Sequence, residues 1–248
     1  MFQELLKIYQ SSLVNEGAPK CLFAETLIFN EGWLLRSVLR EWLLSARSVQ
    51  FGFLPFPAGI TVYSEGQLYT PFKARFRGDD QAETNTRVDG IVGDYSITDS
   101  KSGIMLKPDF RYIAVFEAKL YAPIAAGTKN APWYDQVSRT AACLINSMLL
   151  ANPRGSYAAH LAVLYAEDNP HIDPNLYTKD YVEKQITKRL QDFSKTGEPG
   201  NAVERFARGW RDVLDNMRIH FHTWEQVLAE IGCEGLDRFY DRCRKFNR

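Results

Sequence analysis

The sequence contains no Cys-x-x-Cys pair, because its four cysteines, Cys21, Cys143, Cys233 and Cys243, lie far apart in 248 residues. Cysteines scattered in this way indicate buried thiols in a reducing compartment, and they argue against a disulfide framework or a cysteine-ligated zinc site. No apolar run reaches the ~18 residues that a membrane span requires, and no signal-type apolar segment follows the N-terminus. We therefore expect a cytoplasmic protein with no membrane partner.

The motifs of several large enzyme classes are also missing. There is no Gly-x-Ser-x-Gly elbow for a serine hydrolase, and no Walker-type loop, Gly-x-x-x-x-Gly-Lys-Ser/Thr, for a nucleotide. Charge of one sign is not in excess, since 30 basic residues balance 30 acidic ones. A protein of this kind that binds nucleic acid must concentrate its positive charge locally, because its overall field attracts no polyanion.

Apolar residues are plentiful, at 45% of the chain, and their spacing predicts the architecture. The expected elements are a helix over 26–46, strands over 60–69, 86–95 and 111–120, a helix over 133–150 and a strand over 158–166. This order predicts an α/β core with a mixed central sheet, in which the second helix crosses over to a parallel strand.

The pattern changes after residue 168. It predicts helices over 181–193 and 202–217, a short segment at 219–222, and two more helices that begin near Thr223 and Leu236. We expect residues 1–168 to form the α/β core and residues 169–248 to form a helical extension packed on it. His220 and His222 make a His-x-His motif, but no third or fourth ligand lies nearby in the sequence, so a structural role is favoured over a zinc site.

Two charges interrupt the apolar strand predicted over 111–120. The run before them is typical of a central strand covered on both faces, and it ends in Glu117-Ala118-Lys119. Side chains alternate along a strand, so Glu117 and Lys119 point to the same face. Buried charge is costly unless it is paired or bound to metal. The alternative is an ordinary Glu–Lys pair where the strand emerges into solvent.

Asp89 lies amid apolar residues of the preceding predicted strand, and the alternative for it is a hairpin turn formed by Asp89-Gly90. If the two strands are neighbours, Asp89, Glu117 and Lys119 come together. Two carboxylates at short range repel each other unless a cation lies between them, and their oxygens suit Mg²⁺ or Mn²⁺. Such a metal holds a water and the scissile phosphate, while Lys119 balances the negative charge that develops.

An aspartate on one strand, Glu-x-Lys at the end of the next, and a helix before and after them resemble the PD-(D/E)XK nuclease superfamily. The common core of that superfamily is helix, three strands, helix, strand, and the resemblance covers residues 26–166. By motif, Asp89 matches the family aspartate, Glu117 the second acid and Lys119 the lysine. Val88 replaces the proline that names the motif, which is a frequent departure. The resemblance implies a restriction-endonuclease-like core with these three residues as its catalytic set.

Two helical positions extend the site that the resemblance implies. Many members carry an acid on the first helix, here Glu31, which would complete the metal shell directly or through water; the alternative is an acid placed to suit the helix start. Several branches carry a glutamine on the second helix, here Gln136, and Arg139 follows one turn later on nearly the same face. Gln136 is therefore a candidate catalytic residue and Arg139 a candidate phosphate contact. A solvated helix face is the alternative for both.

The small residues of the loop over 125–131 would allow close backbone approach to a ligand, with Lys129 reaching a phosphate. An ordinary connection is the favoured interpretation of this loop.

The function that the resemblance implies is divalent-metal-dependent hydrolysis of phosphodiester bonds, with Mg²⁺ or Mn²⁺ as cofactor and DNA as the expected partner. A homodimer is compatible with it, because many such nucleases dimerise to cut both strands. Two other functions stay open. One is a catalytically inactive binding or scaffold module with the same fold. The other is a metal-dependent hydrolase of small phosphate esters, which the zero net charge suits better.

Overall fold

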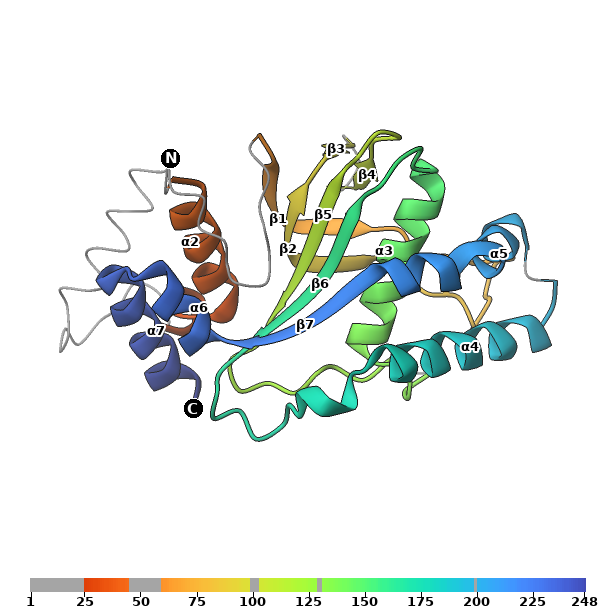
Figure 1. The fold of residues 1–248 in the computed structure, drawn as a ribbon. Helices are drawn as coiled ribbons and strands as arrows, with labels where there is room; N and C mark the ends of the chain where they lie inside the picture. The colour runs from red at the N-terminus through yellow and green to blue at the C-terminus, as the bar shows by residue number, and fades with distance from the viewer. Residues whose placement is uncertain (1–24, 45–58, 99–102, 129–130, 199) are drawn as a thin grey trace.

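The computed structural model describes residues 25–44, 59–98, 103–128, 131–198 and 200–248. Its described part contains a five-stranded mixed sheet in the order β1 (Thr61–Leu68), β2 (Thr86–Gly93), β5 (Tyr112–Ala118), β6 (Ala158–Tyr165) and β7 (Met217–Thr223). β1, β2 and β5 pair in antiparallel fashion, whereas β5, β6 and β7 run parallel. The protein is therefore of the mixed α/β class (Figure 1).

Helices cover both faces of this sheet (Figure 1). One face carries α3 (Gln136–Ala151), α4 (Lys179–Lys195) and α5 (Gly200–Asn216), and the other carries α2 (Glu31–Leu44), α6 (Trp224–Ile231) and α7 (Glu234–Asn247). Both parallel connections pass through helices, as a parallel pair requires: α3 joins β5 to β6, and α4 with α5 joins β6 to β7. No helix among the described residues is long and apolar enough to cross a membrane.

The central strand is β5, and the structure confirms that it is covered on both faces. All seven of its residues are buried. Ile113 and Val115 pack in the core beneath α3, whereas Ala114 and Phe116 pack in the core beneath α2. The continuous apolar run in the sequence follows from this double burial.

Asp89 and Gly90 lie inside β2, so they do not form the hairpin turn that the dipeptide alone suggests. The glycine has a packing role instead. A Cβ built on Gly90 would lie 3.0 Å from Leu35 Cδ2 and 3.1 Å from Leu39 Cδ1, both on α2. The absence of a side chain at this position therefore allows α2 to pack closely against the sheet.

Helix α3 begins at Gln136, three residues later than the apolar pattern predicts. Asp135 is its N-cap, because its side chain accepts a hydrogen bond of 2.9 Å from the backbone N–H of Ser138. Such a bond satisfies one of the free donors of a helix start. The cap places the Gln136 side chain in the first turn of α3, at the end that faces the end of β5.

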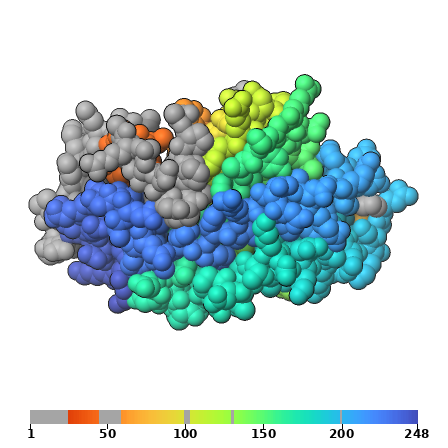
Figure 2. Space-filling view, in the orientation of Figure 1, coloured from red at the N-terminus to blue at the C-terminus, as the bar shows by residue number. Residues whose placement is uncertain are grey.

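The C-terminal part of the chain was expected to be helical, and this expectation needs one correction. The segment 217–223 is strand β7, which pairs with β6 over its whole length, so residues beyond 168 complete the central sheet. α4, α5, α6 and α7 are helical as predicted. In the space-filling view, the C-terminal residues form a continuous band across one face of the molecule (Figure 2).

Two short strands, β3 (Tyr95–Ile97) and β4 (Ile104–Leu106), form a separate hairpin before β5. Short 3-10 helices lie at Glu25–Leu27 and Pro174–Leu176.

Candidate active site

Asp89, Glu117 and Lys119 come together at the C-terminal end of β5. The antiparallel register of β2 and β5 ends with the pair Gly90 and Phe116, and Asp89 and Glu117 are the next residue on each strand beyond that pair. The carboxylate of Asp89 reaches across to β5, where its Oδ2 accepts a hydrogen bond of 2.7 Å from the backbone N–H of Ala118. Adjacent strands therefore place two acids side by side, as the sequence predicted.

Two side chains of helix α3 donate hydrogen bonds to the carboxyl group of Glu117. Glu117 is only 1% exposed. Its Oε1 accepts a hydrogen bond of 2.8 Å from Thr140 Oγ1, and its Oε2 accepts one of 2.5 Å from Gln136 Nε2. Gln136 and Thr140 are four residues apart, so they lie on the same face of the helix. The structure thus connects Gln136 to the acid pair, and it adds Thr140, which the sequence analysis missed.

The surroundings of the two carboxyl groups disfavour their ionised forms. Burial, and after it the neighbouring charge of Asp89, raises the pKa of Glu117 to about 8. Burial also raises the pKa of Asp89 above its usual value, although the hydrogen bond from Ala118 opposes this effect. Glu117 therefore favours its protonated form at neutral pH when no cation is bound, because burial, and after it the charge of Asp89, disfavours its ionised form.

Lys119 is fixed through its backbone at the same end of β5 as Glu117. Its N–H donates to the carbonyl of Leu164 at 2.8 Å, and its own carbonyl accepts from Trp224 Nε1 at 2.9 Å. Its positive charge lowers the pKa of both Asp89 and Glu117, which places the ammonium near them. Within the described part of the chain its Nζ forms neither an ion pair nor a hydrogen bond. Because Glu117 is buried, the pair is not an ordinary solvent-exposed Glu–Lys contact.

The donor set fits a small divalent cation. Asp89 Oδ1 accepts no hydrogen bond from the described residues, and Gln136 Oε1 is a buried acceptor that also lacks a partner there. Mg²⁺ commonly binds through one or two carboxylates and keeps several water or phosphate ligands, so two acids are sufficient for it. Among the described residues no group of three or more His, Cys, Asp or Glu residues could hold a metal ion by itself.

The remaining predicted residues have different positions. Glu31 is the first residue of α2, and its charge helps to raise the pKa of Cys243 on α7; the structure does not gather it into one cluster with Asp89 and Glu117. Arg139 lies near Glu117, whose pKa its charge lowers, and its Nε is buried without a hydrogen bond to any described residue. Lys129 lies outside the described residues.

The histidines of β7 join a third histidine from β6. His160 Nδ1 lies 3.0 Å from His220 Nε2, and the ring of His220 stacks on that of His222 at 5.9 Å between centroids. Burial is the main reason that the pKa values of His160 and His222 fall to about 4. All three side chains are neutral at pH 7, and no group of three or more His, Cys, Asp or Glu among the described residues could hold a metal ion.

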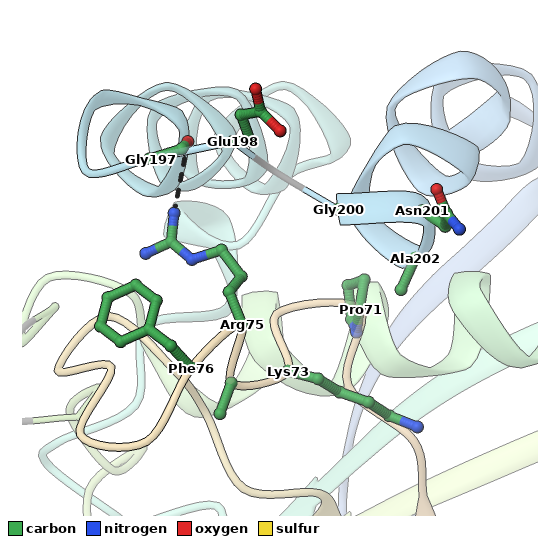
Figure 3. A pocket seen from close by; sticks show the side chains of 10 residues that line it. Pro71, Lys73, Arg75, Phe76, Gly197, Glu198, Gly200, Asn201 and Ala202 are labelled. Carbon is green, nitrogen blue, oxygen red and sulfur yellow. Dashed lines mark hydrogen bonds between the residues drawn. The ribbon is translucent and has the colours of Figure 1, made fainter.

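A surface hollow of about 570 Å³ lies between the segment that follows β1 and the start of α5 (Figure 3). Arg75 crosses it to donate a hydrogen bond of 3.4 Å to the carbonyl of Gly197, and it forms an ion pair of 2.7 Å with Asp79. Its described lining offers one carboxylate, Glu198, and no second acid. The hollow therefore lacks the paired oxygen ligands found at the end of β5.

Comparison of the chain with models of protein families, with curated proteins and with solved structures finds no match in any of the three.

Proposed function

We propose that this chain is a divalent-metal-dependent nuclease that hydrolyses phosphodiester bonds in DNA and has a restriction-endonuclease-like core. The observation that carries the proposal is the meeting of Asp89, Glu117 and Lys119 at the end of a buried central strand, where α3 holds Glu117. The order of the elements supports it: apart from the short β3–β4 hairpin inserted between β2 and β5, α2 is followed by three strands of the main sheet, then α3 and β6, as in the superfamily that the sequence resembles.

Each side chain has a definite part in this proposal. The carboxylates of Asp89 and Glu117 supply the oxygen ligands, and the bonds from Gln136 and Thr140 fix the direction of Glu117. Mg²⁺ or Mn²⁺, when bound, supplies an activated water and polarises the scissile phosphate. Lys119 provides a positive charge that offsets the charge developing on the phosphate oxygens, which is a large contribution in a partly buried site.

The acid pair also explains why metal and protons should compete. A carboxyl that binds a metal ion must be ionised, so the binding of Mg²⁺ or Mn²⁺ should release the proton that Glu117 holds at neutral pH. The described cysteines Cys143, Cys233 and Cys243 are free thiols, which fits the cytoplasmic location that we propose.

The decisive experiment is a cleavage assay on supercoiled plasmid, single-stranded DNA and RNA, with Mg²⁺, Mn²⁺ or a chelator. We expect DNA cleavage with either metal, none with the chelator, and a severe loss in the Lys119→Ala variant. If the folded protein cleaves none of these substrates but hydrolyses a small phosphodiester, it is an esterase of small phosphates. If it hydrolyses neither, the catalytic proposal is wrong and the inactive binding module is the better description.

A further inference from the structure

The strand next to Asp89 contains an unusual backbone conformation. Glu65 on β1 has a φ of 61°, in the left-handed region that residues with a side chain rarely adopt. Among the described residues the other non-glycine residue with a positive φ is Asn152, which ends helix α3, where such a conformation is common. Glu65 has no such explanation, since it lies in the middle of a strand.

This conformation coincides with a break in the pleat of both strands. The register pairs Ser64 with Gly90 and Gly66 with Val88, and the residues between them, Glu65 and Asp89, are not paired. In a regular strand, residues two apart face the same side. Here they do not.

The two faces can be read from the packing of the flanking residues. Ser64 and Gly90 face α2, because Ser64 Oγ accepts a hydrogen bond from Arg36 and a Cβ on Gly90 would meet Leu35. Gly66 faces the opposite core, where a Cβ would lie 3.2 Å from Ile91 Cγ2, and Val88 packs in that same core beneath α3. Both strands therefore rotate between these pairs. The rotation turns Asp89 away from the regular pleat, toward Ala118 at the end of β5.

A short chain of polar contacts fixes the rotation. Arg36 on α2 donates from Nε to Ser64 Oγ at 2.8 Å and from Nη2 to Glu65 Oε1 at 3.1 Å. Ser64 Oγ in turn donates to the backbone carbonyl of Asp89 at 3.1 Å. The guanidinium also lies over the Trp33 ring, 5.0 Å from its centroid. An Arg–Glu pair that is 32% and 43% exposed adds little stability by itself, so the geometric constraint is its more important effect.

We propose that Glu65 is a positioning residue for the active site: its left-handed conformation, held by Arg36, turns Asp89 toward Glu117. The inference rests on the proposed function for its consequence in catalysis, but the placement of Asp89 can be measured without catalysis. Backbone strain of this kind persists only where the surrounding contacts enforce it, and it is concentrated at functional sites. Glu65 itself need not touch substrate or metal.

The direct readout is hydrogen exchange of the Ala118 amide, which is protected by its bond to Asp89. Valine, a β-branched residue, strongly disfavours a positive φ, whereas glycine accepts it. We expect Glu65→Val to lower Ala118 protection several-fold, because a β-branched residue tolerates a positive φ less well than glutamate and because the change removes the carboxylate that Arg36 holds. Glu65→Gly should restore most of the protection, and Arg36→Met should lower it. The amide of Val115, in the paired part of β5, reports whether the sheet itself stays intact.

Metal affinity and cleavage provide the functional readouts. In calorimetry with Mn²⁺, Glu65→Val should bind more weakly, by a factor that follows its loss of Ala118 protection. Its cleavage rate at saturating DNA should fall more than its KM changes, since Glu65 acts through Asp89 and not through the substrate. Arg211→Met, which removes an exposed pair with Glu183 on α4 and α5, is the matched control and should match the wild type in every assay.

The outcomes separate this inference from the nuclease proposal. If Ala118 protection is the same in Glu65→Val, Arg36→Met and the wild type, the positioning role is wrong, whatever the protein cleaves. If protection in the variants falls as expected while the wild type cleaves no nucleic acid, the positioning role stands and the proposed function fails. Equal loss of protection at Val115 and Ala118 would mean that Glu65 supports the whole sheet, and this result would also overturn the inference.

Discussion

Replacing Glu117 with glutamine should stabilise the metal-free protein while it abolishes activity. The carboxyl is buried beside Asp89, and its pKa of about 8 means that the folded state resists its ionisation. Glutamine has the same shape and no charge. Its carbonyl can still accept from Thr140, and its NH₂ group can donate to Gln136 Oε1 once that amide turns over, because this oxygen lacks a partner among the described residues.

The size and the sign of the effect follow from linkage. The pKa of Glu117 is higher in the folded state than its ordinary value of 4.5, so the folded state binds more protons and stability falls as pH rises between 4.5 and about 8. At about 1.4 kcal/mol for each pKa unit, the ceiling is roughly 5 kcal/mol. The electrostatic cost is shared with Asp89 and offset in part by Lys119. We therefore expect Glu117→Gln to raise the unfolding free energy by about 1–3 kcal/mol at pH 8 and by almost nothing at pH 4.

Urea unfolding at pH 4 and pH 8 with a chelator measures this change, and Glu83→Gln is the matched control. Glu83 is also buried, but it pairs with Arg189 at 2.6 Å, and both side chains are 1% exposed. The same substitution there leaves a buried guanidinium unpaired and should cost about 3–5 kcal/mol. With Mn²⁺ present, the wild type should gain stability and Glu117→Gln should not. If Glu117→Gln loses stability at pH 8 as Glu83→Gln does, Glu117 is a paired structural anion and the proposed metal site is wrong.

Three further predictions concern the other side chains. Lys119→Ala should bind Mn²⁺ normally but cleave DNA about 10²–10³-fold more slowly in single-turnover assays, as loss of one electrostatic donor typically does; full cleavage would remove Lys119 from the site. Asp89→Asn should lose Mn²⁺ affinity first, so that excess Mn²⁺ partly restores its cleavage, and an unchanged calorimetric affinity would contradict its role as a ligand. Gln136→Ala and Thr140→Val should each slow cleavage by about tenfold or more while Tm changes by only a few degrees; wild-type rates in both would show that α3 merely covers Glu117.

The sequence predicted the parts of the fold that depend on strong apolar patterns. β5 is an unbroken apolar run because it is buried on both faces, and the same run makes Glu117 stand out. α3 and β6 were predicted for similar reasons. The closeness of Asp89 and Glu117 required that β2 and β5 be neighbours in the sheet, which they are although the β3–β4 hairpin lies between them in the chain.

Other features depend on contacts that no local pattern records. β7 alternates apolar and polar residues, as a half-buried strand does, but no local pattern shows that this seven-residue segment between helices pairs with β6. Thr140 is an ordinary helical residue until α3 is placed over β5. Its one local signal is the spacing of four residues from Gln136. The left-handed Glu65 is unpredictable because glutamate does not favour that conformation; it results from Arg36 on another element.

The buried acids of this protein differ in whether an arginine lies at ion-pair distance, and this difference argues for a metal site. Asp79 and Glu83 are buried acids, and each has an arginine at ion-pair distance. Glu117 is buried more deeply, yet its nearest polar partners in the described structure are a neutral amide and a hydroxyl, with another acid beside it. A sequence selected for stability alone would place an apolar residue there. Retaining this costly arrangement is expected where a cation from outside the chain completes the site, since local rules are broken mainly where function requires it.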